Sequence, residues 1–111
     1  MSFLVESALL THGLKSISNY SLNERWVFDT KNICWVDSGK IIRGNIKEFL
    51  PFRSKAEKLI RIDSSLLSEA IENRYSGALT ASGTMAVCTK LGINGAVTCG
   101  MGGIGDIVGE E

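Results

Sequence analysis

Glycine is concentrated in the last third of the chain, and this pattern constrains the fold more than any other feature. Nine of the twelve glycines in the 111 residues lie between Gly77 and Gly109. Small and apolar residues in this stretch predict, in order, a helix buried on nearly every side, a turn, a short core strand and a glycine-rich loop. These elements fall at residues 78–91, 94–95, 96–99 and 100–105. Ligands of open α/β sheets bind outside the carboxyl ends of the strands, so the loop is the first candidate site.

The preceding residues alternate between strands and helices. Apolar runs bounded by turn residues predict strands at 3–10, 33–36, 41–42 and 59–62, with the middle pair joined as a hairpin. Helical spacing predicts short helices in three further places: at a capping box that begins with Ser21, as one turn before Pro51 in the stretch from Asn45 to Phe52, and after Asp63 or Ser64. This order predicts a single α/β domain over residues 1–111, with Ile60 and Val97 in neighbouring core strands.

Composition argues against several classes of protein. Twelve basic residues balance twelve acidic ones, so a general attraction to nucleic acid or to membranes is not expected. No targeting or membrane-spanning segment is recognisable, and three cysteines without C-x-x-C spacing indicate neither a disulfide framework nor a metal site. We therefore expect a cytoplasmic protein. The segment from Lys40 to Arg61 carries seven basic residues against two acidic ones, and is either a solvated face or a weak RNA-binding surface.

Two polar residues near the amino terminus could carry chemistry. Glu6 falls inside the first predicted strand, where a buried carboxylate is costly unless it is paired or hydrogen-bonded. It is therefore either a satisfied structural acid or a working one. His12 is the only histidine of the chain, and it is either a hydrogen-bonded turn residue or a ligand.

The glycine loop has two interpretations. Gly100, Gly102 and Gly105 match the dinucleotide-binding spacing, but that fingerprint also needs a following helix and an acidic residue about 20 positions later. Only six residues of the sequence follow Gly105, which argues against a dinucleotide site. The loop is then either a place where backbone packs tightly on backbone or an anion site. Its further donors would be the hydroxyls of Thr80, Ser82 and Thr84 and the guanidinium of Arg61.

Four motifs occur in the order, and at spacings compatible with those, of a known family. They are ESALLTHGL from Glu6, VDSGKI from Val36, GALTASGTM from Gly77 with Leu91-Gly92-Ile93, and GGIG from Gly102. In these motifs the sequence resembles the amino-terminal part of the pseudouridine monophosphate glycosidases, also called the indigoidine synthase A-like family. The resemblance implies a three-layer α/β/α fold, a sugar-phosphate ligand, a divalent metal such as manganese, and homotrimers. It also implies reversible cleavage of the carbon–carbon bond that joins uracil to ribose phosphate.

The site residues of the family carry over only in part. Glu6 matches the acid that donates a proton, and Ala81 matches a position that contacts substrate. The phosphate-side lysine of the family falls on Arg61, or on Lys58 if three residues are inserted. The remaining predicted substrate contacts are Thr80, Thr84, Gly102, Gly103 and Gly105. After the last motif the family continues into a histidine, a metal-binding acid and a nucleophilic lysine, and none of these is matched here. The resemblance therefore supplies no metal ligand and no amine for the covalent step.

Together these observations predict a truncated homologue of the pseudouridine monophosphate glycosidases that binds a phosphosugar or phosphate and is catalytically incomplete alone. Two alternatives stay open: a non-catalytic interaction subunit, and one half of a split glycosidase whose other half is a separate chain. A partial sheet would leave apolar surface uncovered, so we expect a homo-oligomer. Whether any enzymatic activity remains is left open.

Overall fold

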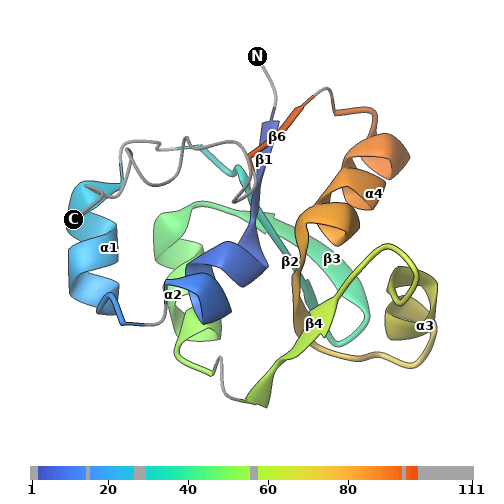
Figure 1. The fold of residues 1–111 in the computed structure, drawn as a ribbon, viewed down its shortest axis with the longest axis horizontal. Coiled ribbons are helices and arrows are strands. Elements are labelled where there is room, and N and C mark those ends of the chain that lie inside the picture. Colours follow the sequence, from blue (N-terminus) through green and yellow to red (C-terminus); the bar gives the residue numbers. More distant parts are fainter. Residues whose placement is uncertain (1–2, 15, 27–29, 56–57, 94, 98–111) are drawn as a thin grey trace.

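The computed structural model describes residues 3–14, 16–26, 30–55, 58–93 and 95–97 (Figure 1). The elements in chain order are β1 (Phe3–Glu6), the π-helix η1 (Leu9–Gly13), α1 (Asn19–Arg25), β2 (Ile33–Asp37), β3 (Lys40–Gly44), α2 (Ile46–Arg53), β4 (Ile60–Ile62), α3 (Leu67–Glu72), β5 (Gly77–Leu79), α4 (Ala81–Leu91) and β6 (Gly95–Val97). The strands form one six-stranded sheet of mixed direction. None of the helices in the described ranges combines the length and the apolar character that crossing a bilayer requires.

β2 is the strand around which the sheet is arranged. β3 pairs antiparallel along its whole length. The other side of β2 is divided, because β1 pairs parallel with Ile33 and Cys34 while β5 pairs antiparallel with Trp35 and Val36. β6 and β4 pair parallel with the outer sides of β1 and β5, respectively. β1 and β5 therefore lie in line along one side of β2 and run toward each other.

Helices cover both faces of this sheet, which confirms the predicted three-layer arrangement. Successive side chains of a strand point to opposite faces, and in β1 Val5 packs in one core cluster while Leu4 packs in the other. The cluster around Val5 contains Leu22 of α1 and Phe49 of α2, whereas the cluster around Leu4 contains Ala70 of α3 and Val87 of α4. Figure 1 shows η1, α1 and α2 on one side of the strands and α3 and α4 on the other.

The prediction that Ile60 and Val97 lie in neighbouring core strands is wrong. The hydrogen-bonded order is β4-β5-β2-β1-β6, so β4 and β6 do not pair with each other. Ile60 pairs with Gly77, and Val97 pairs with Val5. Short apolar strands of similar composition carry no local signal for their partners, because the pairing depends on packing across the sheet.

Two predicted elements have different boundaries. β1 ends at Glu6 rather than continuing to residue 10, and the apolar run that follows forms η1, where Thr11 Oγ1 donates to the carbonyl of Ser7 at 3.0 Å. Residues 77–79 form β5, and Thr80 caps a helix that begins only at Ala81. That helix is not buried on every side, since Met85 is 60% exposed and Leu91 is 44% exposed.

Local capping signals explain the other differences. Helix α1 begins at Asn19, because Ser18 rather than Ser21 is its cap and accepts the Ser21 backbone N–H at 3.1 Å. Helix α2 continues through Pro51 to Arg53. A proline inside a helix removes one N–H donor, and packing of Phe49 and Phe52 in the core holds the last turn in place. The β2–β3 hairpin is confirmed, as is the left-handed cap at Gly92, whose φ is 72°.

Candidate functional site

The carboxyl ends of four strands converge at one place in the sheet. β1 and β5 meet end to end, and the Leu79 backbone N–H donates to Ser7 Oγ at 2.8 Å. Beside them β6 ends opposite Val5 and β4 ends opposite Leu79. From this junction the chain leaves β1 into η1, in one helical layer, and leaves β5 into α4, in the other. A point where adjacent strands lead to opposite faces is where α/β proteins form ligand crevices.

Glu6 lies at the end of β1 and is only 4% exposed. Its neighbours on the sheet are Cys34 in β2 and, beyond it, Arg43 in β3. Strand alternation places these three residues on the face covered by α4. Burial, and to a smaller extent Cys88, raises the pKa of Cys34 to about 12, while the charge of Arg43 acts in the opposite direction. Cys34 therefore stays a neutral thiol at neutral pH, and Glu6 is the acidic residue among these three neighbours.

Thr80 ties the start of α4 to the end of β4. Its backbone N–H donates to the carbonyl of Ile62 at 3.0 Å, and its hydroxyl also reaches that carbonyl, at 3.3 Å. The same hydroxyl accepts the Gly83 backbone N–H at 3.3 Å, which caps the helix. Thr84 is fully buried, and its hydroxyl donates to the Thr80 carbonyl at 2.8 Å. Ala81 is half-buried in the first turn, where the backbone amides of a helix have no partner within it.

Gly83 allows α4 to dock this closely. A Cβ atom built on Gly83 would lie 2.2 Å from the carbonyl oxygen of Ile62. No side chain fits there without a shift of the backbone, so glycine is required for close approach rather than for an unusual φ. The small-residue pattern of this stretch therefore has a structural role at the junction itself.

The two candidate phosphate-side cations lie at different ends of β4. Arg61 is exposed, pairs with Ala78 and stands one residue before the carboxyl end of the strand. Alternation places its side chain on the face opposite Ile62, the face of η1. Lys58 is exposed before the amino end of β4. The structure thus brings Thr80, Ala81 and Thr84 to the junction with Glu6, and sets Arg61 closer to it along β4 than Lys58. The predicted glycine-loop contacts, Gly102, Gly103 and Gly105, lie outside the described residues.

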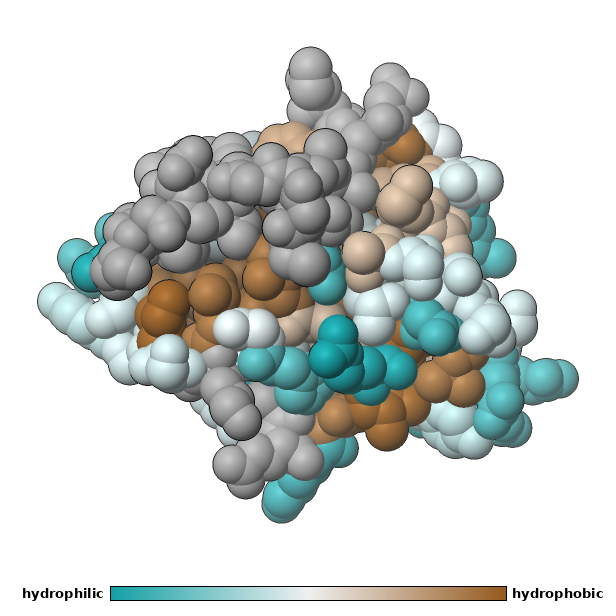
Figure 2. Space-filling model, in the orientation of Figure 1, coloured by the Kyte–Doolittle hydropathy of each residue, from teal (hydrophilic) through white to brown (hydrophobic). Residues whose placement is uncertain are grey.

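Figure 2 shows hydrophilic surface between the η1 segment and β4, with apolar surface on either side of it. Within the described ranges, no group of three or more histidine, cysteine, aspartate or glutamate side chains is arranged to hold a metal ion. The described junction presents hydroxyls, backbone amides, the carboxyl group of Glu6 and the nearby guanidinium of Arg61.

The roles of two residues in this region are not recognisable from the sequence. Ser7 is fully buried and joins β1 to β5, but nothing local distinguishes it from other serines. In the sequence, Arg53 is recognisable only as one of the basic residues between Lys40 and Arg61. In the structure it is 8% exposed and donates to the carbonyls of Leu10, Leu14 and Ile17. Both roles depend on partners far away in the sequence.

Comparison with known proteins finds similarity in structure alone. No family model matches the chain, and no curated protein matches it in sequence. The solved structure of the prealnumycin C-glycosynthase AlnA in complex with ribulose 5-phosphate matches with a TM-score of 0.58 and 16% identity, over 86% of this chain and 32% of that one. An indigoidine synthase A-like protein from Thermotoga maritima matches with a TM-score of 0.61 and 18% identity, over 87% of this chain and 35% of its own. The chain spans about a third of the length of both structures, and its fold is the indigoidine synthase A-like fold that the four sequence motifs predicted.

Proposed function

We propose that this chain binds a phosphosugar, or phosphate alone, where the carboxyl ends of β1, β4, β5 and β6 converge. The observation that carries this proposal is the end-to-end meeting of β1 and β5 at the Ser7–Leu79 hydrogen bond. It places the last residue of β1 beside the first turn of an eleven-residue helix, α4. The exposed amides at the start of such a helix favour an anion.

The donors and the acid at the junction suit different parts of a phosphosugar. The first-turn amides, including that of Ala81, would hold phosphate oxygens. Arg61, whose side chain leaves β4 on the η1 face, would reach the same phosphate around the carboxyl end of the strand and add a charge-assisted, forked contact. Glu6 would repel a phosphate but can accept hydrogen bonds from sugar hydroxyls, so it belongs at the sugar end. The ribulose 5-phosphate complex of the structural neighbour AlnA supports this choice of ligand class.

Binding without turnover is the second part of the proposal. Cleavage through a Schiff base needs an activated amine. Of the two candidate lysines, Lys58 lies before the amino end of β4 and Lys90 lies near the far end of α4. We therefore expect the 111-residue chain to form no covalent adduct with ribose 5-phosphate in the presence of borohydride. An adduct detected by mass spectrometry would show that a lysine of this chain carries the covalent step, and would contradict this part of the proposal.

Titration calorimetry with ribose 5-phosphate and uridine monophosphate tests the binding site. A few charge-assisted contacts in an open site predict a Kd on the order of millimolar to tens of micromolar. Arg61→Ala should lose most of this affinity, whereas Lys58→Ala should lose little because Lys58 lies at the other end of β4. Lys47→Ala, an exposed position on α2, controls for the loss of one positive charge. No heat at millimolar ligand, or unchanged binding by Arg61→Ala, would overturn the assignment.

A role as an interaction subunit is the second candidate, and one observation favours it. Met85 is 60% exposed on α4. In that case either another copy or a separate chain, as in a split glycosidase, would cover the outer face of α4. The two candidates differ in the calorimetry, because an interaction subunit binds neither ligand alone.

A further inference from the structure

Arg53 concentrates its hydrogen bonds on the segment that leaves β1. Its Nε donates to the Leu10 carbonyl at 2.6 Å, and its Nη2 donates to the carbonyls of Leu14 and Ile17 at 2.7 and 2.6 Å. Its Nη1 donates to Asn19 Oδ1 at 2.6 Å. All four acceptors are neutral, and all lie within ten residues of one another in the sequence.

Burying the guanidinium of Arg53 among neutral acceptors costs free energy. We take this cost as a sign that the segment must be held in one position. Arg53 is 8% exposed, and burial lowers its pKa. A buried cation is ordinarily balanced by an acid, yet within the described part of the chain the hydrogen bonds of Arg53 go to carbonyl and amide oxygens. The segment it holds includes η1, a π-helix, and such turns are rare and occur frequently at functional sites.

The hydrogen bonds continue from Arg53 to the ligand junction. Arg53 holds the carbonyl of Leu10, and the next residue, Thr11, donates from its hydroxyl to the carbonyl of Ser7 at 3.0 Å. Ser7 Oγ in turn accepts the backbone N–H of Leu79 at 2.8 Å. The guanidinium is thus connected through two short steps of η1 to the place where β1 and β5 meet.

We propose that Arg53 is a positioning residue that fixes η1 and thereby preorganises the ligand site at the end of β1. This inference rests on the proposed function for its effect on binding. Lysine cannot replace arginine here, because a single ammonium group cannot reach four acceptors that a planar fork of donors spans.

Hydrogen exchange followed by mass spectrometry tests the positioning without any ligand. Arg53→Ala should raise exchange at least tenfold in peptides covering residues 9–19 and leave the β2–β3 hairpin unchanged. Guanidinium ion at millimolar concentration should reverse the increase by occupying the vacated position. Arg53→Lys should show the same local increase without rescue, and Lys47→Ala on the same helix should match the wild type.

Calorimetry with ribose 5-phosphate then tests the consequence for binding. We expect Arg53→Ala to weaken binding at least tenfold and guanidinium to restore it. If the wild type binds nothing, the proposed function fails, and the exchange result still decides whether Arg53 positions η1. Unchanged exchange in residues 9–19, or equal binding by the folded variant, would overturn the inference. If Arg53→Ala does not fold, Arg53→Lys decides: a local increase supports positioning, and a uniform increase across all elements overturns it.

Discussion

Gly83 shows how much of the junction depends on the absence of a single side chain. A Cβ atom on residue 83 would lie 2.2 Å from the carbonyl oxygen of Ile62, and this same oxygen accepts the backbone N–H of Thr80. Any larger residue must push the start of α4 away from the end of β4, which would also separate the first-turn amides from the strand ends.

We therefore predict that Gly83→Ala lowers the free energy of unfolding by about 1–3 kcal/mol, the usual cost of overpacking. Gly13→Ala is the matched control, because the closest contact of its added Cβ would be the side chain of Leu9, at 3.0 Å, which can move, and the carbonyl oxygen of Ala8 would lie at 3.8 Å, an ordinary contact distance. Urea unfolding followed by tryptophan fluorescence measures both. Equal stability of the two variants would mean that the backbone around Ile62 relaxes without cost.

The residues of the candidate site differ in how far away in the sequence their hydrogen-bond partners lie. Glu6 and Thr80 could be identified from the sequence, since an acid in an apolar run and a hydroxyl before a small-residue helix are local signals. Ser7 bonds to a residue 72 positions away, and Arg53 to one 43 positions away. No local pattern encodes such contacts, so neither residue could be found before the fold was known.

At the level of elements, the β2–β3 hairpin and the carboxyl end of α4 were predictable, whereas the other helix ends and the strand order were not. The β2–β3 hairpin and the cap at Gly92 follow from glycine at positions of positive φ, since Gly39 has φ 81° and Gly92 has φ 72°. The division of β2 between β1 and β5 depends instead on which helices cover each face. Apolar strands of three or four residues do not specify this choice on their own.

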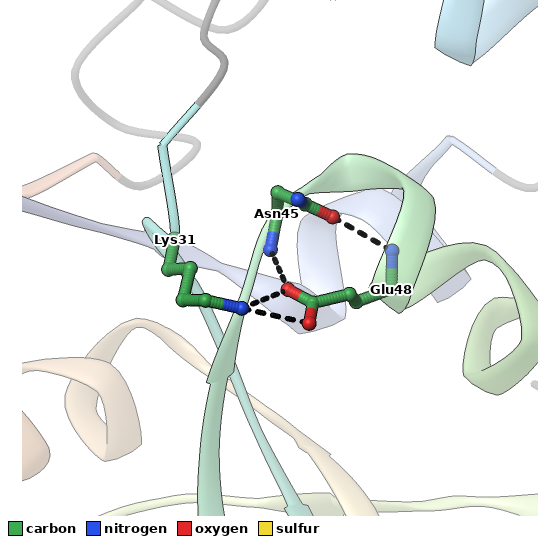
Figure 3. Close-up of polar contacts among 3 residues, drawn as sticks. All are labelled: Lys31, Asn45 and Glu48. Carbon is green, nitrogen blue, oxygen red and sulfur yellow. Dashed lines mark hydrogen bonds and ion pairs between the residues drawn. The ribbon is translucent and has the colours of Figure 1, made fainter.

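The start of α2 gives a prediction about pH. Glu48 and Asn45 form a capping box, and Lys31 Nζ contacts both carboxylate oxygens of Glu48 at 2.6 and 2.7 Å (Figure 3). The hydrogen bond from Lys31, and then that from the Asn45 backbone, lower the pKa of Glu48 in the folded chain. Its contribution to stability is therefore fully present above the unfolded pKa, roughly 4.3, and is lost as the pH falls through the lower folded value.

We predict that Glu48→Gln is less stable than the wild type at pH 7 and that the difference shrinks below about pH 4.3, the unfolded value. Glutamine keeps an acceptor for the Asn45 backbone N–H, so the comparison isolates the charge. Urea midpoints measured from pH 7 to pH 3 decide it. A gap that stays constant across this range would show that the ion pair with Lys31 contributes nothing.

At the scale of the whole molecule, uncovered apolar side chains on α4 predict self-association. Met85 is 60% exposed and Leu91 is 44% exposed on α4, and removing apolar side chains from water is the dominant favourable contribution to association. We expect an oligomer in light scattering at tens of micromolar, and we expect Met85→Glu to shift it toward monomer. Tyr20→Glu is the control, since Tyr20 is 74% exposed on α1 in the opposite layer. A monomeric wild type would count against both an oligomeric assembly and an interface on α4.

The meeting of β1 and β5 also has a consequence for the order of folding. A contact between residues 72 apart in the sequence closes a large loop, and such contacts form late because the chain entropy must be lost first. Ser7→Ala should therefore speed unfolding and leave the refolding rate unchanged in stopped-flow measurements, the behaviour of interactions absent from the transition state. A refolding rate that fell while the unfolding rate stayed the same would place the contact in the transition state instead. On this view the β2–β3 hairpin forms first, and the junction of β1 and β5, where we propose that a ligand binds, is the last part of the molecule to assemble.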